Sequence, residues 1–103
     1  MNINDYIYLY VFDLEKSLIN MKKLREDRFG VIINKTILFN NNGNNAILYD
    51  IKLFNDKIIQ YRTDNLATNM ISIEQLKGII NKIDISYDKK EMLINQINHI
   101  IHK

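Results

Sequence analysis

The sequence predicts a single α+β domain that spans residues 1–103. Apolar and polar residues alternate in three successive runs between Val31 and Thr63, which is the pattern of β-strands. Later in the chain, apolar residues recur at helical spacing in residues 73–83 and 93–101, and a serine that can cap a helix precedes each segment. Apolar residues make up 47% and charged residues 25% of the chain, which is an ordinary balance for a globular domain.

The N-terminal segment fits two descriptions. Its apolar residues repeat at spacings of four and three, which predicts one long helix that Gly30 would end. These residues are Ile7, Val11, Leu14, Leu18 and Met21. In the alternative, residues 6–12 form a strand, Asp13 caps, and a shorter helix runs from residue 14 to about residue 27, because residues 6–12 are rich in strand-preferring types. We favour the long helix because the stripe continues without a phase slip. The predicted order is α-β-β-β-α-α, with β-α-β-β-β-α-α as the alternative.

The three alternating runs predict a three-stranded antiparallel meander. Residues 41–45 and 55–57 connect the runs and are rich in Asn and Asp, which tolerate turn conformations. Keeping the apolar residues on one face requires an odd loop of about three or five residues, which pairs Phe39 with Ile47 and Ile37 with Tyr49. Lys35 falls on that apolar face, which suits an edge strand protected from further pairing.

The last third of the chain predicts a helical pair after a polar link over residues 64–71. Ser72 and Gln75 have the spacing of a capping box, and Ser86 can cap the second helix after a break at residues 84–85. We expect the long N-terminal helix to pack on the apolar face of the meander. The other face is only partly polar, so we expect the helical pair to cover part of it.

Composition limits the chemistry and suggests a source. The chain has no Cys, which excludes disulfides and thiolate chemistry. Its 20 Ile and 15 Asn are residues of A/T-rich codons, which favours a low-GC bacterium or a phage, plasmid or virus of such a host. The apolar run of residues 6–12 is bounded by Asp5 and Asp13 and follows no basic region, so we expect a cytoplasmic protein without a signal peptide and without a membrane span.

No residue pattern indicates catalysis. His99 and His102 share a helical face but have no third metal ligand nearby in the sequence. The three serines lie outside any nucleophile motif, and the three glycines form no phosphate-binding loop. We therefore expect a non-catalytic protein with no metal and no cofactor.

The aromatic cluster near the N-terminus predicts a protein interface. A helix that is apolar on nearly every side must be buried on every side, and in a small domain a partner chain can supply that cover. Tyr is also enriched in interfaces. The predicted interface residues are Tyr6, Tyr8, Tyr10, Phe12, Leu48 and Phe54. We expect a protein-binding module, homodimeric or bound to another protein; the low-GC composition suggests an accessory protein of a phage or mobile element that inhibits or regulates a host protein.

A basic cluster supports the alternative of a nucleic-acid-binding regulator. Its cations are Lys22, Lys23, Arg25 and Arg28 on the predicted first helix, with Lys52 and Arg62 on the sheet. Such cations can contact phosphates. The net charge of +2 does not by itself imply a polyanionic partner.

Overall fold

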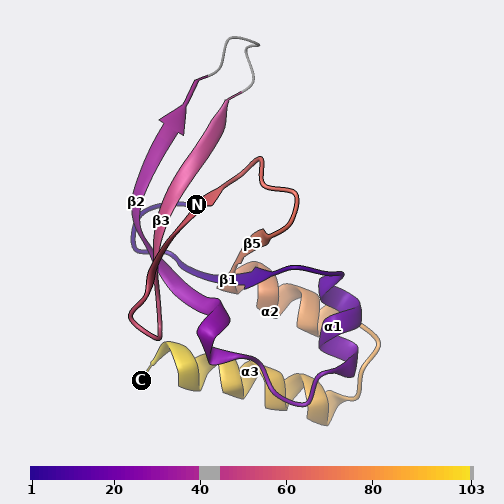
Figure 1. Cartoon of the computed structure of the whole chain (residues 1–103). Coiled ribbons are helices and arrows are strands. Elements are labelled where there is room, and N and C mark those ends of the chain that lie inside the picture. Colours follow the sequence, from indigo (N-terminus) through magenta and orange to yellow (C-terminus); the bar gives the residue numbers. More distant parts are fainter. Residues whose placement is uncertain (40–44, 103) are drawn as a thin grey trace.

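The computed structural model describes residues 1–39 and 45–102 and confirms the α+β class. In this part of the chain, five strands and three α-helices follow the order β-α-β-β-β-β-α-α (Figure 1). The elements are β1 (Tyr6–Tyr10), α1 (Leu14–Asn20), the 3-10 turn η1 (Glu26–Arg28), β2 (Phe29–Leu38), β3 (Ala46–Leu53), β4 (Ile58–Arg62), β5 (Asn69–Ser72), α2 (Ile73–Lys82) and α3 (Tyr87–Ile101).

The strands form one antiparallel sheet in the order β4-β3-β2-β1-β5. The predicted meander is present as β2, β3 and β4, and the structure adds β1 and β5 to its β2 side. β2 pairs with β3 along most of its length, but with β1 only through Phe29, Gly30 and Val31. The two halves of the sheet therefore share only the beginning of β2.

The favoured prediction of one long N-terminal helix is wrong. Residues 6–10 form β1, which pairs with β2 on one side and with β5 on the other. The alternative order is closer, since the Asp13 side chain accepts a hydrogen bond from the Lys16 backbone N–H at 3.3 Å and caps α1. However, α1 ends at Asn20, well before residue 27. Pairing on both edges satisfies the backbone of β1, and this long-range gain outweighs the helical spacing of its apolar residues.

The link over residues 64–71 was also wrongly predicted to lack a strand. Residues Asn69–Ser72 form β5, whose Ile71 lies opposite Tyr8 of β1. Only Met70 and Ile71 are apolar in this strand, so it carries no alternating pattern of its own. β5 leads directly into α2, and Ser72 is both its last residue and the N-cap of α2.

A β-bulge changes the apolar face of β2. The register shifts between Ile32 and Asn34, so Ile32 is buried opposite Ile51, while Ile33 is exposed. In the sequence Val31 alternates in phase with Ile37 and Phe39, but the extra residue at the bulge reverses the alternation, so Ile32 and not Val31 shares the face of Ile37. Gly30 is not a helix stop but a buried residue of β2, where a Cβ atom would lie 2.7 Å from Ile51 Cγ2.

The register beyond the bulge differs from the prediction by two residues. Ile37 pairs with Ile47 and Lys35 pairs with Tyr49, so the expected apolar residues still share a face. The last pair among the described residues is Leu38 with Ala46, and the predicted loop of three or five residues falls on the connection that follows it. Residues 40–44 of that connection lie outside the described part of the chain.

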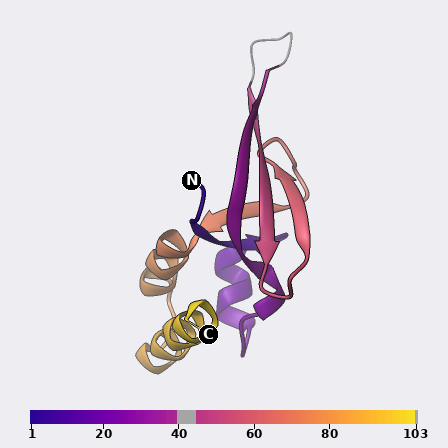
Figure 2. The same cartoon turned by 90° about the vertical axis from the view of Figure 1, so that its left-hand side faces the viewer.

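Two hydrophobic clusters lie on opposite faces of β1. Tyr8 points into the larger cluster, which the three helices build with Phe29 and Ile71. Ile7 and Leu9 point into a smaller cluster, where they meet residues of β2, β3 and β4. Figure 2 shows the reason: β1 and β5 run across the lower part of the β2–β3–β4 strands, with the helices beside them. The helices therefore cover the β1–β5 half of the sheet, and not the face of the meander that we expected.

The C-terminal helices are confirmed. Ser72 and Gln75 form the predicted capping box of α2, and Ser86 caps α3 by accepting from the Lys89 backbone N–H. The Lys89 ammonium in turn donates to the carbonyl of Ile19 near the end of α1, which ties α3 to α1. Within the described residues, no helix is both long enough and apolar enough to cross a membrane.

Candidate protein-interaction surface

The far end of the β2–β3 pair projects beyond the helices. We call this part the ribbon and define it as residues 34–38 of β2 with residues 46–50 of β3. It extends away from the helices in both views (Figures 1 and 2), and the molecule measures 49 × 28 × 18 Å along its principal axes. Among the described residues, no strand pairs with residues 34–38 on the side opposite β3. The ribbon therefore has an open edge, although β2 is a central strand at its other end.

Hydrogen bonds of β3 show which backbone groups face that edge. The Thr63 N–H donates to the Ile47 carbonyl at 3.0 Å, so Ile47 turns its backbone toward the β4 side. Backbone groups alternate along an antiparallel strand, so the even-numbered residues of β3 bond to β2. Their partners in the ribbon are Asn34, Thr36 and Leu38. Lys35 and Ile37 must then direct their N–H and C=O groups away from β3, toward the open edge.

Apolar side chains accompany these outward backbone groups. Ile37 is 53% exposed and Phe39, the next residue after β2, is 79% exposed. Neither residue belongs to one of the two hydrophobic clusters. Ile47, the neighbour of Ile37 across the ribbon, packs on the edge of the smaller cluster. An apolar strip thus runs from the interior onto the open edge.

The opposite face of the ribbon carries a row of polar residues that bond to one another, beside the apolar residues Leu38, Ala46 and Leu48. Asp50 accepts a hydrogen bond from the Gln60 side chain at 3.1 Å and lies 3.4 Å from the Asn34 side-chain nitrogen. These three residues form one row across β2, β3 and β4. Because their polar groups bond to one another, this row has less to offer a partner than the open edge does.

The six predicted interface residues do not gather on one surface. Tyr8 is only 4% exposed and is part of the larger core, so it cannot contact a partner without unfolding. Tyr6 packs edge-on against Phe54, with ring centroids 6.0 Å apart. Tyr10 is half-buried near α2, Phe12 is 78% exposed before α1, and Leu48 is half-buried on the ribbon. Ile37 and Phe39 were not predicted, since their alternation in the sequence indicates a core strand.

Of the six predicted nucleic-acid contacts, Lys52 and Arg62 lie on the sheet as expected, but the four cations expected on the first helix do not lie on an α-helix. Lys22, Lys23, Arg25 and Arg28 follow α1 in the loop and in η1. Three of the six cations form ion pairs with aspartates: Arg25 with Asp27 at 2.7 Å, Arg62 with Asp64 at 3.0 Å and Lys52 with Asp56 at 4.0 Å. The Arg25 guanidinium lowers the pKa of the Asp27 carboxyl, mainly through their hydrogen bonds. These aspartates offset the positive charge that phosphates would require.

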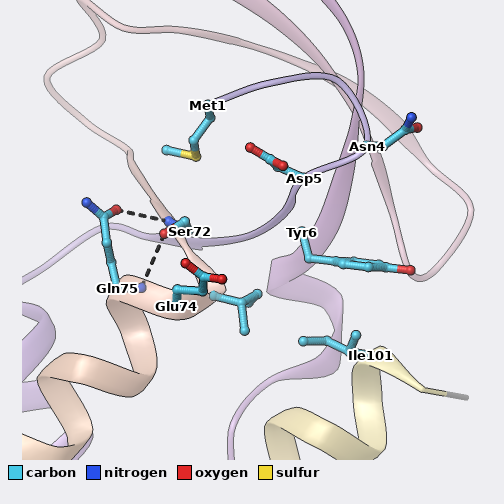
Figure 3. A pocket seen from close by; sticks show the side chains of 9 residues that line it. Met1, Asn4, Asp5, Tyr6, Ser72, Glu74, Gln75 and Ile101 are labelled. Carbon is cyan, nitrogen blue, oxygen red and sulfur yellow. Dashed lines mark hydrogen bonds between the residues drawn. The ribbon is translucent and has the colours of Figure 1, made fainter.

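A hollow with a volume of about 710 Å³ lies between the N-terminal segment and the start of α2. Asp5, Glu74 and Tyr6 line it together with the capping box of α2 (Figure 3). The Ser72 hydroxyl accepts from the Gln75 backbone N–H at 3.2 Å and is thus engaged as a cap. Asp5 accepts from the Asn2 backbone N–H at 2.8 Å. Among the described residues, no three His, Cys, Asp or Glu side chains are grouped in a way that could hold a metal ion.

Two tyrosines have a raised pKa, and burial is the main cause in both. Burial raises the pKa of Tyr8 above 10.0, and the positive charges of Arg28 and Arg25 only partly offset this. Burial also raises the pKa of Tyr61, with a smaller contribution from Tyr10. Tyr8 belongs to the larger cluster and Tyr61 to the smaller one, and neither residue lines the hollow beside Tyr6.

The fold and the surface together define a small α+β protein with a projecting β-ribbon. Comparison with models of known protein families, with curated proteins and with solved structures finds no match for the chain.

Proposed function

We propose that this chain is a non-catalytic protein-binding module that accepts a strand of another polypeptide along the open edge of its ribbon. The observation that carries the proposal is the coincidence of outward backbone groups at Lys35 and Ile37 with exposed apolar side chains at Ile37 and Phe39. Backbone bonds supply affinity in strand addition, and side chains supply specificity.

The ribbon edge lacks most of the features that protect edge strands. Charged residues, prolines and covering segments normally prevent such strands from pairing with other chains. Lys35 is the one charged residue in residues 34–38, and its ammonium donates to the Met1 carbonyl at 3.2 Å. Leaving Ile37 and Phe39 exposed on an open edge is costly for a protein that has no partner.

The other two edges of the sheet are less suitable. β4 has five residues, and its outward backbone groups belong to the alternate residues Ile58, Gln60 and Arg62. Of these, Gln60 and Arg62 are polar and already bonded to Asp50 and Asp64. β5 has only four residues and continues directly into α2.

A pull-down with matched variants tests the proposal. The tagged protein is incubated with lysate of a low-GC bacterium, with and without nuclease, beside the variants Ile37→Pro and Phe12→Ser. Proline at residue 37 removes an outward N–H while leaving the bonds between β2 and β3, which edge strands tolerate. Phe12 is as exposed as Phe39 but lies outside the ribbon, so it serves as the control.

We expect a defined protein to bind the wild type and Phe12→Ser equally, and to bind Ile37→Pro roughly tenfold less or not at all. Circular dichroism checks that the variants remain folded, and Ile37→Lys repeats the test without proline. Equal binding by all ribbon variants would overturn the proposal. Binding that disappears with nuclease would instead support the basic residues and the nucleic-acid alternative. That such a target is a host protein, inhibited by an accessory protein of a mobile element, stays a prediction from composition.

A further inference from the structure

We infer that the strand that pairs with the ribbon edge is the same edge of a second copy of this chain, running antiparallel about a two-fold axis at Ile37. This inference rests on the proposed function and names the partner of the same site. Any two-fold pairing of β2 with itself must place one residue opposite its own copy. Along the open edge, the axis positions that leave two described residues to pair on either side are Lys35, Thr36 and Ile37.

Charge excludes the first of these registers. An axis at Lys35 would set two ammonium groups directly opposite each other on adjacent strands. Like charges in that position are destabilising, and the nearest bonded group to Lys35 is a carbonyl, not a carboxylate. Nothing in this register therefore offsets the repulsion between the two ammonium groups.

The N-terminal segment disfavours the second register. An axis at Thr36 pairs Phe39 with Ile33 of the second copy and needs the edge to be open back to the bulge. The Asn4 N–H, however, donates to the Ile32 carbonyl at 2.7 Å, and the Met1 carbonyl lies 3.2 Å from the Lys35 ammonium. Residues 1–4 thus lie beside β2 at this point, and the edge opens only from about Lys35 onward.

An axis at Ile37 uses only the open part of the edge. Ile37 then lies opposite Ile37 of the second copy, and both direct their N–H and C=O groups across the interface. Since Ile37 pairs with Ile47 within each chain, a continuous apolar row forms across the joined sheets. Lys35 falls opposite Phe39 of the second copy, where an ammonium can contact an aromatic face instead of another cation. All of the exposed apolar side chains of the edge are used.

The pairing is short, and this determines the kind of dimer. Residues 35–39 span roughly 17 Å of strand, and the edge buries less than the standard interface of about 1,600 Å². We expect a weak dimer that depends on protein concentration. The whole chain carries a net charge of only +2, so long-range repulsion between copies is small.

The absence of native Cys permits a direct test of the register. Residues opposite each other in such a bonded pair have Cα atoms about 5.5 Å apart, which a disulfide can bridge. Ile37→Cys should therefore form a covalent dimer under mild oxidation. Lys35→Cys alone should not, because its two copies would lie roughly 13 Å apart, but it should link to Phe39→Cys when the two variants are mixed. Phe12→Cys is the control for random collision of exposed thiols.

Sedimentation of the wild type and of Ile37→Pro completes the experiment. We expect the wild type to shift from monomer to dimer as its concentration rises, and Ile37→Pro to lose that shift. A monomeric wild type, with Ile37→Cys crosslinking no faster than Phe12→Cys, overturns the second-copy inference. The proposed function survives that result if Ile37→Pro still abolishes capture of a different protein. Crosslinking through Lys35→Cys or a Thr36→Cys variant alone would overturn the Ile37 register.

Discussion

Among single residues, Tyr6 and Tyr8 have different surroundings although they are two positions apart on β1. Side chains two positions apart share a face of a strand, and both point toward the helical side of the sheet. Tyr8 is covered there, with its ring centroid 4.8 Å from that of Phe29, whereas Tyr6 lies at the margin beside Phe54. The sequence run of alternating tyrosines therefore contains both core and surface positions.

The buried Tyr8 should make folding sensitive to alkaline pH. Its pKa is raised in the folded state, so the neutral hydroxyl contributes fully below the usual value of 10.0 and that contribution is lost as pH rises through the folded pKa. The thermal midpoint of wild type, followed by circular dichroism, should fall as pH rises above about 10. The thermal midpoint of Tyr8→Phe should fall less steeply over the same pH range. Tyr87→Phe, at an exposed position, is the control, and an equal slope in all three proteins would contradict the assignment.

At the scale of elements, α1 depends on its cap. A helix of seven residues is marginal without tertiary support, and Leu14 and Leu18 are its buried residues. Asp13→Ala should lower the free energy of unfolding by about 1 kcal/mol, because it leaves an N-terminal backbone N–H unsatisfied. Urea denaturation measures this change. Asp13→Asn retains a capping oxygen and should restore most of the loss; if it does not, the contribution of Asp13 is not capping.

The elements also show which structural signals are present in a single sequence. Ser72, Gln75 and Ser86 act on residues three positions away, so both C-terminal helices were predictable from local pattern. β5 was not predictable, because it exists only as a partner of β1 from the other end of the chain. The bulge at Ile33 was likewise hidden, since an apolar residue on either face of β2 gives the same sequence pattern.

Only the general type of the candidate site, and not its residues, was predictable from the sequence. An exposed aromatic and apolar surface was expected, but Tyr8 belongs to the core and the open edge lies at residues 35–39. Ile37 and Phe39 look like core residues in the sequence because strand alternation does not report how far a partner strand extends. β1 pairs with only the first three residues of β2, and that length difference creates the edge.

At the scale of the whole molecule, the two hydrophobic clusters should unfold together. β1 joins them, with Tyr8 in the larger cluster and Ile7 and Leu9 in the smaller one. Ile51→Ala in the smaller cluster and Leu93→Ala in the larger one should each cost about 2–5 kcal/mol, and in each variant the helical and the tyrosine signals should change in one transition. Far-ultraviolet circular dichroism and tyrosine fluorescence test this together. Separate midpoints would show that the clusters are independent.

The alternating direction of the backbone groups along the ribbon should also determine how fast its amide protons exchange with solvent. Amide protons of Asn34, Thr36 and Leu38 bond to β3, whereas those of Lys35 and Ile37 face the open edge. In hydrogen exchange, neighbouring amides of one strand should therefore show slow and fast rates in turn. When a strand adds to the edge, the fast amides of Lys35 and Ile37 should slow while their neighbours change little. Comparing the exchange rate of an outward amide with that of its bonded neighbour would then show whether the edge is occupied, without any label.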